Sequence, residues 1–453
     1  MTMSKLPLLE KNAYLSIVIK DNGIWSHLAY TDHDVSREYI LSDFTDLSPL
    51  RHRLDDEVFT KNFWFEYFDN LESVFDWNLV DRSRQAVFTF RRFKNEGDGL
   101  TGIRMQIDDN QKFFEKIFLS VRDFSNDVSL RVIDDRYMST LLGSLIDKSE
   151  YDDLMYVDMD IMDFSVFRVN KMYDKKAKRE KMIFSQAKIS WPNELDVIDS
   201  VKDSRLKAFL ATDLGSEGIY NYWSNFILNR TFFSEDPNLM DILRAYCTIQ
   251  SHSIFRDNKE KLEGFGISKN ESAVIISGYI PRILGKSKSL LTLIDGLEMS
   301  GDFDCYWDLD AKLLSYGKSY VNGTDSTDII LTRKEVFSLL TKVIIPYSKP
   351  VKASNKVILA GVIQSLSEGR NEFYALSPEY SYIELPAHED KLVVEGEFKN
   401  GAYMIPNKEK LLGFVSTPGN KKYESILIDG RIRPIIYGPD SYSNKLKLQT
   451  WIK

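Results

Sequence analysis

The chain has 453 residues, of which 43% are hydrophobic and 13% aromatic, so it can bury a large core and is not a disordered polymer. Its 59 basic and 67 acidic residues give a net charge of −8 at pH 7, which argues against a nucleic-acid-binding protein. No apolar run approaches the ~20 residues that cross a bilayer. Cys247 and Cys305, the two cysteines, lie in apolar segments typical of buried thiols in a reducing compartment. We therefore expect a cytoplasmic protein of two or three domains.

Two β-like runs near the N-terminus, Leu15–Lys20 and Ile24–Tyr30, flank the sequence Asp21-Asn22-Gly23. Asn-Gly between two such runs predicts a β-hairpin. An acidic residue and a glycine at such a turn also suit phosphate binding, because backbone N–H groups must approach the anion closely there. Asp21 and Gly23 are therefore candidate phosphate-binding residues, although most hairpins of this kind are only structural.

The elements predicted after the hairpin complete a first lobe, residues 1–150. Aromatic residues recur at helical spacing through Asp55–Phe75, which predicts an amphipathic helix. Such an aromatic stripe is more often core than a ligand cage. Apolar runs then predict strands at Ala86–Phe90, Gly102–Ile107 and Val128–Ile133, and a helix at Arg136–Ile146.

A dense group of aspartates surrounds the next predicted strand, Leu154–Val157. Its members are Asp152, Asp153, Asp158, Asp160 and Asp163. Such a group can hold Mg²⁺, usually through one or two carboxylates, with waters and phosphate oxygens completing the shell. Asp158 ends the strand and is a candidate metal ligand together with Asp21, whereas a solvated hairpin turn explains the same residues equally well. A strand at Ser165–Val169, an exposed basic loop at Lys171–Lys181 and a return strand at Met182–Ser190 complete this predicted hairpin.

Three helices are predicted next, at Leu195–Thr212, Gly215–Arg230 and Pro237–Ile249. Asp236 immediately precedes the third, and this suits an N-cap followed by proline at the first helical position. The polar stretch that follows, Arg256–Asn270, is expected at the surface.

The segment Glu271–Tyr320 reads as strand, glycine turn, helix, strand and helix. Ala273–Ile276 predicts a buried strand that ends at Ser277-Gly278, and leucines around Leu290–Leu297 recur near helical spacing. Cys305–Leu309 predicts the second strand, and Asp310 is a plausible N-cap for a helix at Ala311–Tyr320. In α/β folds ligands bind beyond the carboxyl ends of such strands. Ser277 and Gly278 are therefore candidate ligand-binding residues, unless Gly278 is only a turn glycine.

After Pro346 the helical spacing gives way to short β runs that alternate with turn residues. They predict a β-rich domain over residues 346–453, after a second lobe over residues 151–345. No motif assigns catalytic residues. Gly285-Lys286-Ser287 lacks the earlier glycine of a P-loop, the five histidines show no metal-ligand spacing, and no G-x-S-x-G sequence occurs.

Two groups of short motifs resemble a known family. Val274–Pro281, Ile294-Asp295-Gly296-Leu297 and Trp307-Asp308-Leu309-Asp310 are similar to the end of the second lobe of glutamate mutase L-like (MutL-like) proteins. Met404-Ile405-Pro406, Ile428-Asp429-Gly430-Arg431 and Trp451 resemble the β domain that follows the ATPase lobes of those proteins. The family belongs to the superfamily of actin, heat-shock chaperone ATPases and sugar kinases. The resemblance implies an α/β, actin-like (ribonuclease H-like) two-lobed ATPase fold with an added C-terminal β domain.

The resemblance also implies a site for ATP and Mg²⁺, built from Asp21, Gly23, Asp158, Asp160, Ser277 and Gly278. Three departures from the family's pattern weaken it. Ile24 and Trp25 stand where Thr or Ser usually follows the first glycine, Asp160 occupies a glycine position, and Tyr279 replaces the second glycine of the adenosine motif. A carboxylate where backbone must touch phosphate repels the anion unless a metal intervenes.

We therefore predict an actin-like scaffold or assembly platform whose nucleotide hydrolysis is impaired or lost. It would bind other proteins, as the PilM-like scaffolds of pilus and secretion machines do, in the cytoplasm or at the inner face of the membrane through its partners. The alternative is a working Mg-ATP-dependent ATPase of the reactivating-chaperone type, with Asp21 and Asp158 near the metal.

Overall fold

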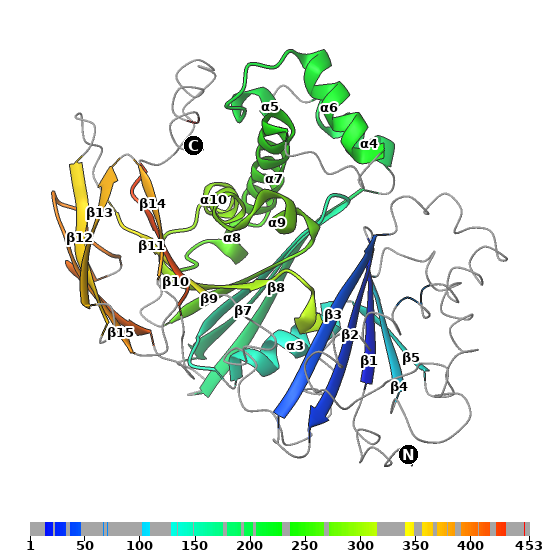
Figure 1. Ribbon diagram of the computed structural model, residues 1–453, viewed down its shortest axis with the longest axis horizontal. Helices are drawn as coiled ribbons and strands as arrows, with labels where there is room; N and C mark the ends of the chain where they lie inside the picture. The colour runs from blue at the N-terminus through cyan, green and yellow to red at the C-terminus, as the bar shows by residue number, and fades with distance from the viewer. Residues whose placement is uncertain are drawn as a thin grey trace, which may run out of the picture. The chain divides into compact units, whose positions relative to one another are not determined.

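A computed structural model describes the regular elements of two compact units (Figure 1). The described residues are 14–20, 23–32, 37–46, 67, 70, 102–108, 128–133, 135–147, 149–174, 179–191, 194–202, 205–228, 236–266, 271–314, 340–347, 356–365, 369–377, 379–385, 391–405, 407–416, 423–431 and 448. Unit 1 comprises Met1–Leu141, Asn229–Thr231 and Asp310–Asp325, and unit 2 comprises Leu142–Leu228, Phe232–Leu309 and Ser326–Lys453. Each unit is described by itself.

The sheet of unit 1 has the strand order β3-β2-β1-β4-β5. Its strands are β1 (Tyr14–Lys20), β2 (Gly23–Asp32), β3 (Arg37–Asp46), β4 (Gly102–Asp108) and β5 (Val128–Ile133), and the helix α3 (Asp135–Asp147) follows. The first three strands form an antiparallel meander, while β4 runs parallel to β1 and β5 runs parallel to β4. Lys20 pairs with Gly23, which confirms the predicted hairpin.

The sheet of unit 2 repeats this arrangement as β8-β7-β6-β9-β10 and then extends it. The repeated strands are β6 (Asp153–Met159), β7 (Asp163–Asp174), β8 (Arg179–Ser190), β9 (Ser272–Ser277) and β10 (Gly301–Asp308). β6, β7 and β8 again form an antiparallel meander, and β9 and β10 run parallel to β6. Every residue of β9 is buried, as its continuous apolar run predicts.

The predicted loop Lys171–Lys181 is wrong over most of its length, because β7 and β8 stay paired as far as Asp174 and Arg179. Main-chain hydrogen bonds hold a strand ladder whatever the side chains are, so a basic composition did not prevent pairing.

The single helix predicted over Leu195–Thr212 is also wrong, because two short helices occupy it, α4 (Glu194–Ser200) and α5 (Arg205–Ala208). The end of that range leaves the helix because Ala211 and Thr212 donate their N–H groups to the Asp241 carboxylate, at 2.8 Å each. A carboxylate on another helix thus replaces the helical hydrogen-bond partners.

Three other helices of unit 2 agree with the predictions: α6 (Ser216–Leu228), α7 (Pro237–Asp257), which extends beyond its predicted end at Ile249, and α10 (Lys286–Gly296). Two short helices, α8 (Lys259–Leu262) and α9 (Tyr279–Leu284), were not predicted, because a polar surface stretch and a glycine turn were expected there. The Asp236 side chain accepts from the Asn238 N–H at 2.8 Å, which confirms the predicted N-cap. α10 packs closely on α7 because Gly296 has no side chain, and a Cβ there would lie 2.2 Å from the Ser251 Cβ.

The C-terminal region is rich in strands, but these strands belong to two sheets. β12 (Lys356–Ser365), β13 (Gly369–Ser377), β15 (Leu392–Phe398) and β16 (Leu411–Ser416) form a four-stranded sheet in the order β13-β12-β15-β16. β11 (Leu340–Ile345), β17 (Ser425–Asp429) and β14 (Tyr380–Glu384) extend the eight-stranded sheet of unit 2 beyond β10. The boundary predicted at residue 346 stays a prediction, and strand pairing already joins residues on both sides of it.

Some predicted elements fall outside the described residues. They are the strand Ala86–Phe90 and the helix Asp55–Phe75 apart from Tyr67 and Asn70. Of the helix predicted at Ala311–Tyr320, residues 312–314 are helical, and the part after 314 lies outside the described residues. No helix in the described part of the chain combines the length and the apolar character needed to span a membrane.

Candidate functional site

The carboxyl ends of β6, β9 and β10 place three polar residues in one row of the unit 2 sheet. Asp158 pairs with Ser277 on one side, and Asp308 pairs with Ser277 on the other. Residues in register on neighbouring strands point to the same face, and their Cα atoms are about 4.8 Å apart. The carboxyl edge of an open α/β sheet is where ligands bind, so this row is the best candidate site in the unit.

The environment of the row is partly closed. Asp308 is 1% exposed, Asp158 is half-buried, and Ser277 is fully buried. The Ser277 hydroxyl has no hydrogen-bond partner. Leaving a buried hydroxyl unpaired costs about 1–3 kcal/mol. Ser272, Ser289 and Ser377 also have buried hydroxyls without a hydrogen-bond partner, so the place of Ser277 at the carboxyl edge makes it a candidate, and not the missing partner alone. Two carboxylates around an unpaired hydroxyl can accept hydrogen bonds from a ligand or hold a hydrated cation.

The structure brings Asp160 next to Gly278, as the predicted site requires, but the carboxylate already has a partner. Asp160 lies in the turn between β6 and β7, is 4% exposed, and accepts a hydrogen bond from the Tyr279 N–H at 2.6 Å. Its own N–H donates to the Asp163 carbonyl at 2.9 Å. The turn after β6 and the start of α9 therefore bind each other.

Gly278 has a structural reason to be glycine. Its φ of 106° lies in the left-handed region. A Cβ at this position would lie 2.5 Å from the Met159 carbonyl oxygen and 2.7 Å from the Met159 nitrogen. The close approach that this glycine permits is therefore to the chain's own backbone, whether or not a ligand also binds.

The remaining predicted site residues lie elsewhere. Asp21 falls outside the described residues, and Gly23 begins β2 in unit 1. Their predicted approach to Asp158 and Gly278 stays a prediction. No three His, Cys, Asp or Glu residues in the described part of the chain are grouped in a way that could hold a metal ion, so the Mg²⁺ ligation by Asp158 also stays a prediction.

Sequence reasoning missed Asp308 as a site residue. The signal was present, because Asp308 ends an apolar strand in the same way as Asp158 does. Only the pairing of both strands with β9 shows that the two carboxylates flank one serine.

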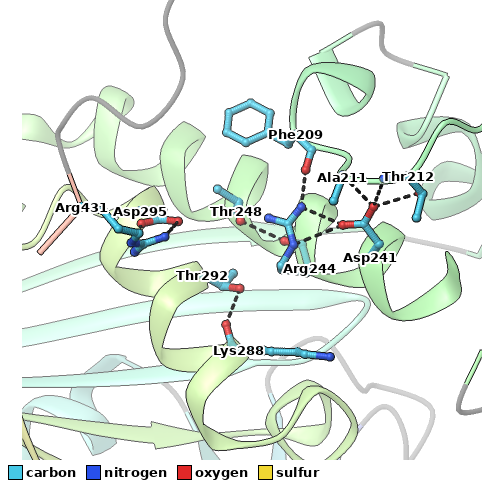
Figure 2. A network of polar contacts seen from close by, with 10 residues as sticks. All are labelled: Phe209, Ala211, Thr212, Asp241, Arg244, Thr248, Lys288, Thr292, Asp295 and Arg431. Carbon is cyan, nitrogen blue, oxygen red and sulfur yellow. Dashed lines mark hydrogen bonds and ion pairs between the residues drawn. The ribbon is translucent and has the colours of Figure 1, made fainter. Parts of the chain in front are cut away.

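A second polar cluster joins the two motifs behind the family resemblance. We call it the Arg431 clamp, and it consists of Arg431, Asp295 and Asp429. Figure 2 shows Arg431 beside Asp295. The Arg431 guanidinium donates to both Asp295 oxygens at 2.7 and 3.1 Å and to both Asp429 oxygens at 2.8 and 2.9 Å. Burial alone would lower the pKa of Arg431, but the two carboxylates raise it above its usual value, so the guanidinium stays charged. The clamp fixes the segment after β17 to the end of α10.

A third cluster, also drawn in Figure 2, centres on α7. Arg244 donates to Asp241 at 2.8 Å and to the Phe209 carbonyl, and both side chains are 6% exposed or less. Because the Arg244 guanidinium and both Asp241 carboxylate oxygens have partners within the chain, we interpret this cluster and the Arg431 clamp as structural.

The doubled strand order, 3-2-1-4-5 in each unit, defines a protein of the actin-like ATPase fold. This confirms the predicted two-lobed α/β architecture. No protein-family model and no curated protein matches the chain, so the glutamate mutase L-like resemblance stays a prediction.

Solved structures with this fold are similar to the chain. The ethanolamine utilization protein EutJ from Carboxydothermus hydrogenoformans is 12% identical over 71% of this chain and 92% of that chain, with a TM-score of 0.35. A Ppx/GppA family member from Aquifex aeolicus is 13% identical over 59% and 66%, with a TM-score of 0.27. A non-polymerisable quadruple mutant of pCBH ParM is 9% identical over 69% and 98%, with a TM-score of 0.31. These likenesses are too distant to say what the chain does.

Proposed function

We propose that this chain is an actin-like scaffold or assembly platform in which nucleotide hydrolysis is impaired or lost. One observation carries the proposal: the Asp160 carboxylate accepts the Tyr279 N–H at the carboxyl edge of the unit 2 sheet. In a phosphate-binding turn such an N–H would point at the anion. Here a built-in carboxylate takes that hydrogen bond.

The charge of Asp160 adds to this effect. Two unit negative charges 4 Å apart repel each other by about 4 kcal/mol at an effective dielectric constant of 20. A phosphate that displaced Asp160 from Tyr279 would meet this repulsion unless Mg²⁺ intervened. The contact of Gly278 with the Met159 backbone supports the same reading, because it accounts for the glycine without a ligand.

The alternative is a Mg-ATP-dependent ATPase of the reactivating-chaperone, glutamate mutase L-like type. The unpaired Ser277 hydroxyl between Asp158 and Asp308 favours it, because a ligand could complete this row. In this case ATP and Mg²⁺ would be the cofactors, with Asp158 beside the metal.

Thermal unfolding with and without saturating Mg-ATP separates the two functions. A ligand at ~100 times its Kd stabilises the folded state by about 2.7 kcal/mol. A scaffold that no longer binds nucleotide predicts no shift in Tm. The ATPase predicts a clear shift that Asp158→Ala abolishes, together with phosphate release from ATP.

Asp199→Ala is the matched control, because Asp199 pairs with Lys202 at the surface, where both side chains are 60% exposed. It should leave any Mg-ATP shift unchanged. A shift that survives Asp158→Ala, without phosphate release, would support a nucleotide-binding scaffold and count against Asp158 as a ligand.

A further inference from the structure

The strand β16 forms an open edge of the four-stranded C-terminal sheet. It pairs with β15 on one side, and no described strand pairs on its other side. An unpaired edge presents a row of backbone N–H and C=O groups that another extended chain can use. The edge is also apolar at both ends, with Leu411 73% and Val415 42% exposed.

Gly413 lies at the centre of this edge, and no contact with the described residues requires a glycine there. Other glycines of this region have a structural reason: a Cβ on Gly361 would lie 2.3 Å from the Phe373 ring, one on Gly430 would lie 2.6 Å from the Leu376 carbonyl oxygen, and Gly369 has a φ of 79°. A Cβ on Gly413 would meet nothing within 4 Å, and its φ is not in the left-handed region. Glycine inside a strand often marks the close approach of a ligand or another backbone.

The missing side chain leaves open space beside a carboxylate. Glu395 on β15 pairs directly with Gly413, so its side chain lies on the same exposed face. No ion pair or hydrogen bond engages the Glu395 side chain in the described part of the chain. Glu397, the next residue on that face, is instead paired with Lys399.

The distance between neighbouring strands determines which side chain of an added strand can reach Glu395. A strand added to β16 would lie about 4.8 Å away, which places its central residue about 10 Å from the Glu395 backbone. An extended Lys or Arg side chain opposite Gly413 can cross this distance and meet the carboxylate. Val393, which pairs with Val415, continues the apolar surface beside that end of the edge.

We propose that the β16 edge accepts an extended segment of a partner protein as a fifth strand. The segment carries Lys or Arg opposite Gly413 and apolar residues opposite Leu411 and Val415. This inference rests on the proposed scaffold function and names the chemistry of its partner. A second copy of the chain fits less well, since β16 itself contains no Lys or Arg between Leu411 and Ser416.

Fluorescence anisotropy tests this with a labelled peptide of about seven residues, valine at its second and sixth positions, arginine at its fourth and threonine elsewhere. A peptide with glutamate in place of arginine is the comparison. The full-length chain should bind the arginine peptide at least tenfold more tightly. Glu395→Lys should reverse this preference, and Gly413→Val should weaken the arginine peptide at least tenfold, because the valine fills the space beside Glu395.

Glu372→Lys is the matched control. It makes the same charge change on the same exposed face, three strands away from β16, and should change the affinity no more than about twofold. Circular dichroism of each variant shows that it folds, and Gly413→Val adds its side chain in open space.

Equal binding of both peptides, no binding at ~1 mM, or an equal effect of Glu372→Lys and Glu395→Lys would each overturn the inference. A dimer in sedimentation that Val415→Pro breaks would overturn it too, because the edge would then belong to a second copy. The Mg-ATP experiment is independent of these results, so this surface can fail while the scaffold function stands.

Discussion

Two polar regions of the same eight-stranded sheet differ in how completely they are paired. At the Arg431 clamp, four side-chain hydrogen bonds join one guanidinium to two carboxylates, and every partner comes from within the chain. At the carboxyl edge, the buried Ser277 hydroxyl lies between two aspartates and makes no hydrogen bond within the described part of the chain. The difference teaches that the clamp is a contact that stabilises the fold, whereas the carboxyl edge keeps a hydroxyl that a ligand could still pair.

The largest expected effect is at the Arg431 clamp. Arg431→Met leaves Asp295 and the fully buried Asp429 without their counter-charge. Removing one partner of a buried ion pair costs about 3–5 kcal/mol. Urea unfolding should therefore show a loss of that size.

The exposed pair Lys399–Glu397 provides the control, because exposed ion pairs contribute about 0–1 kcal/mol. Lys399→Met should change the free energy of unfolding by less than 1 kcal/mol. Equal losses in the two variants would contradict the assignment of the clamp as a fold-holding contact.

The clamp also shows what the sequence could and could not predict. The hairpin at Gly23 and the strand at Ala273–Ile276 were predictable, since Asn-Gly and apolar runs act locally. The partner of Arg431 was not, because Asp295 lies 136 residues away in the chain. Both Asp-Gly motifs were visible, but their contact depends on β17 pairing with β11.

The candidate site also has a part that the sequence could predict and a part that it could not. The family resemblance implied that Asp158, Asp160, Ser277 and Gly278 belong to one site, together with Asp21 and Gly23. It could not predict that the Asp160 carboxylate binds the Tyr279 N–H, 119 residues away. A local sequence pattern predicts which residues lie at the carboxyl edge of the sheet, but only the tertiary structure shows which groups they contact.

A buried histidine in unit 1 tests how burial acts on an ionisable side chain. Burial and the nearby Lys312 charge lower the pKa of His27 from 6.5 to about 3, although a backbone hydrogen bond at Asp310 opposes them. Below pH 6.5 the unfolded chain therefore protonates His27, whereas the folded chain does so only near pH 3. The free energy of unfolding thus decreases as the pH is lowered from 6.5 to about 3. Between pH 7.5 and 4.5 the loss due to His27 is roughly 2–3 kcal/mol.

Urea unfolding of His27→Gln at the two pH values measures this loss. The variant should lose less stability on acidification than the parent chain. Unlike the clamp, this site should respond to pH and not to the removal of a partner. The same pH slope in His27→Gln and the parent chain would show that His27 is protonated in the folded state.

The smallest expected effect contrasts two buried serines of the same sheet. The Ser425 hydroxyl shares a hydrogen bond of 2.8 Å with the Thr341 hydroxyl, whereas the Ser277 hydroxyl has none. Ser425→Ala should destabilise the protein by about 1 kcal/mol, because it removes a hydrogen bond from the buried Thr341 hydroxyl. Ser277→Ala should instead raise the free energy of unfolding by up to about 1 kcal/mol, because it removes an unpaired polar group from a buried position. A serine kept at a cost in stability is expected where function needs the hydroxyl. If Ser277→Ala destabilises the protein as much as Ser425→Ala does, the Ser277 hydroxyl has a partner within the fold. The Arg431 clamp and the carboxyl edge would then not differ in how completely they are paired.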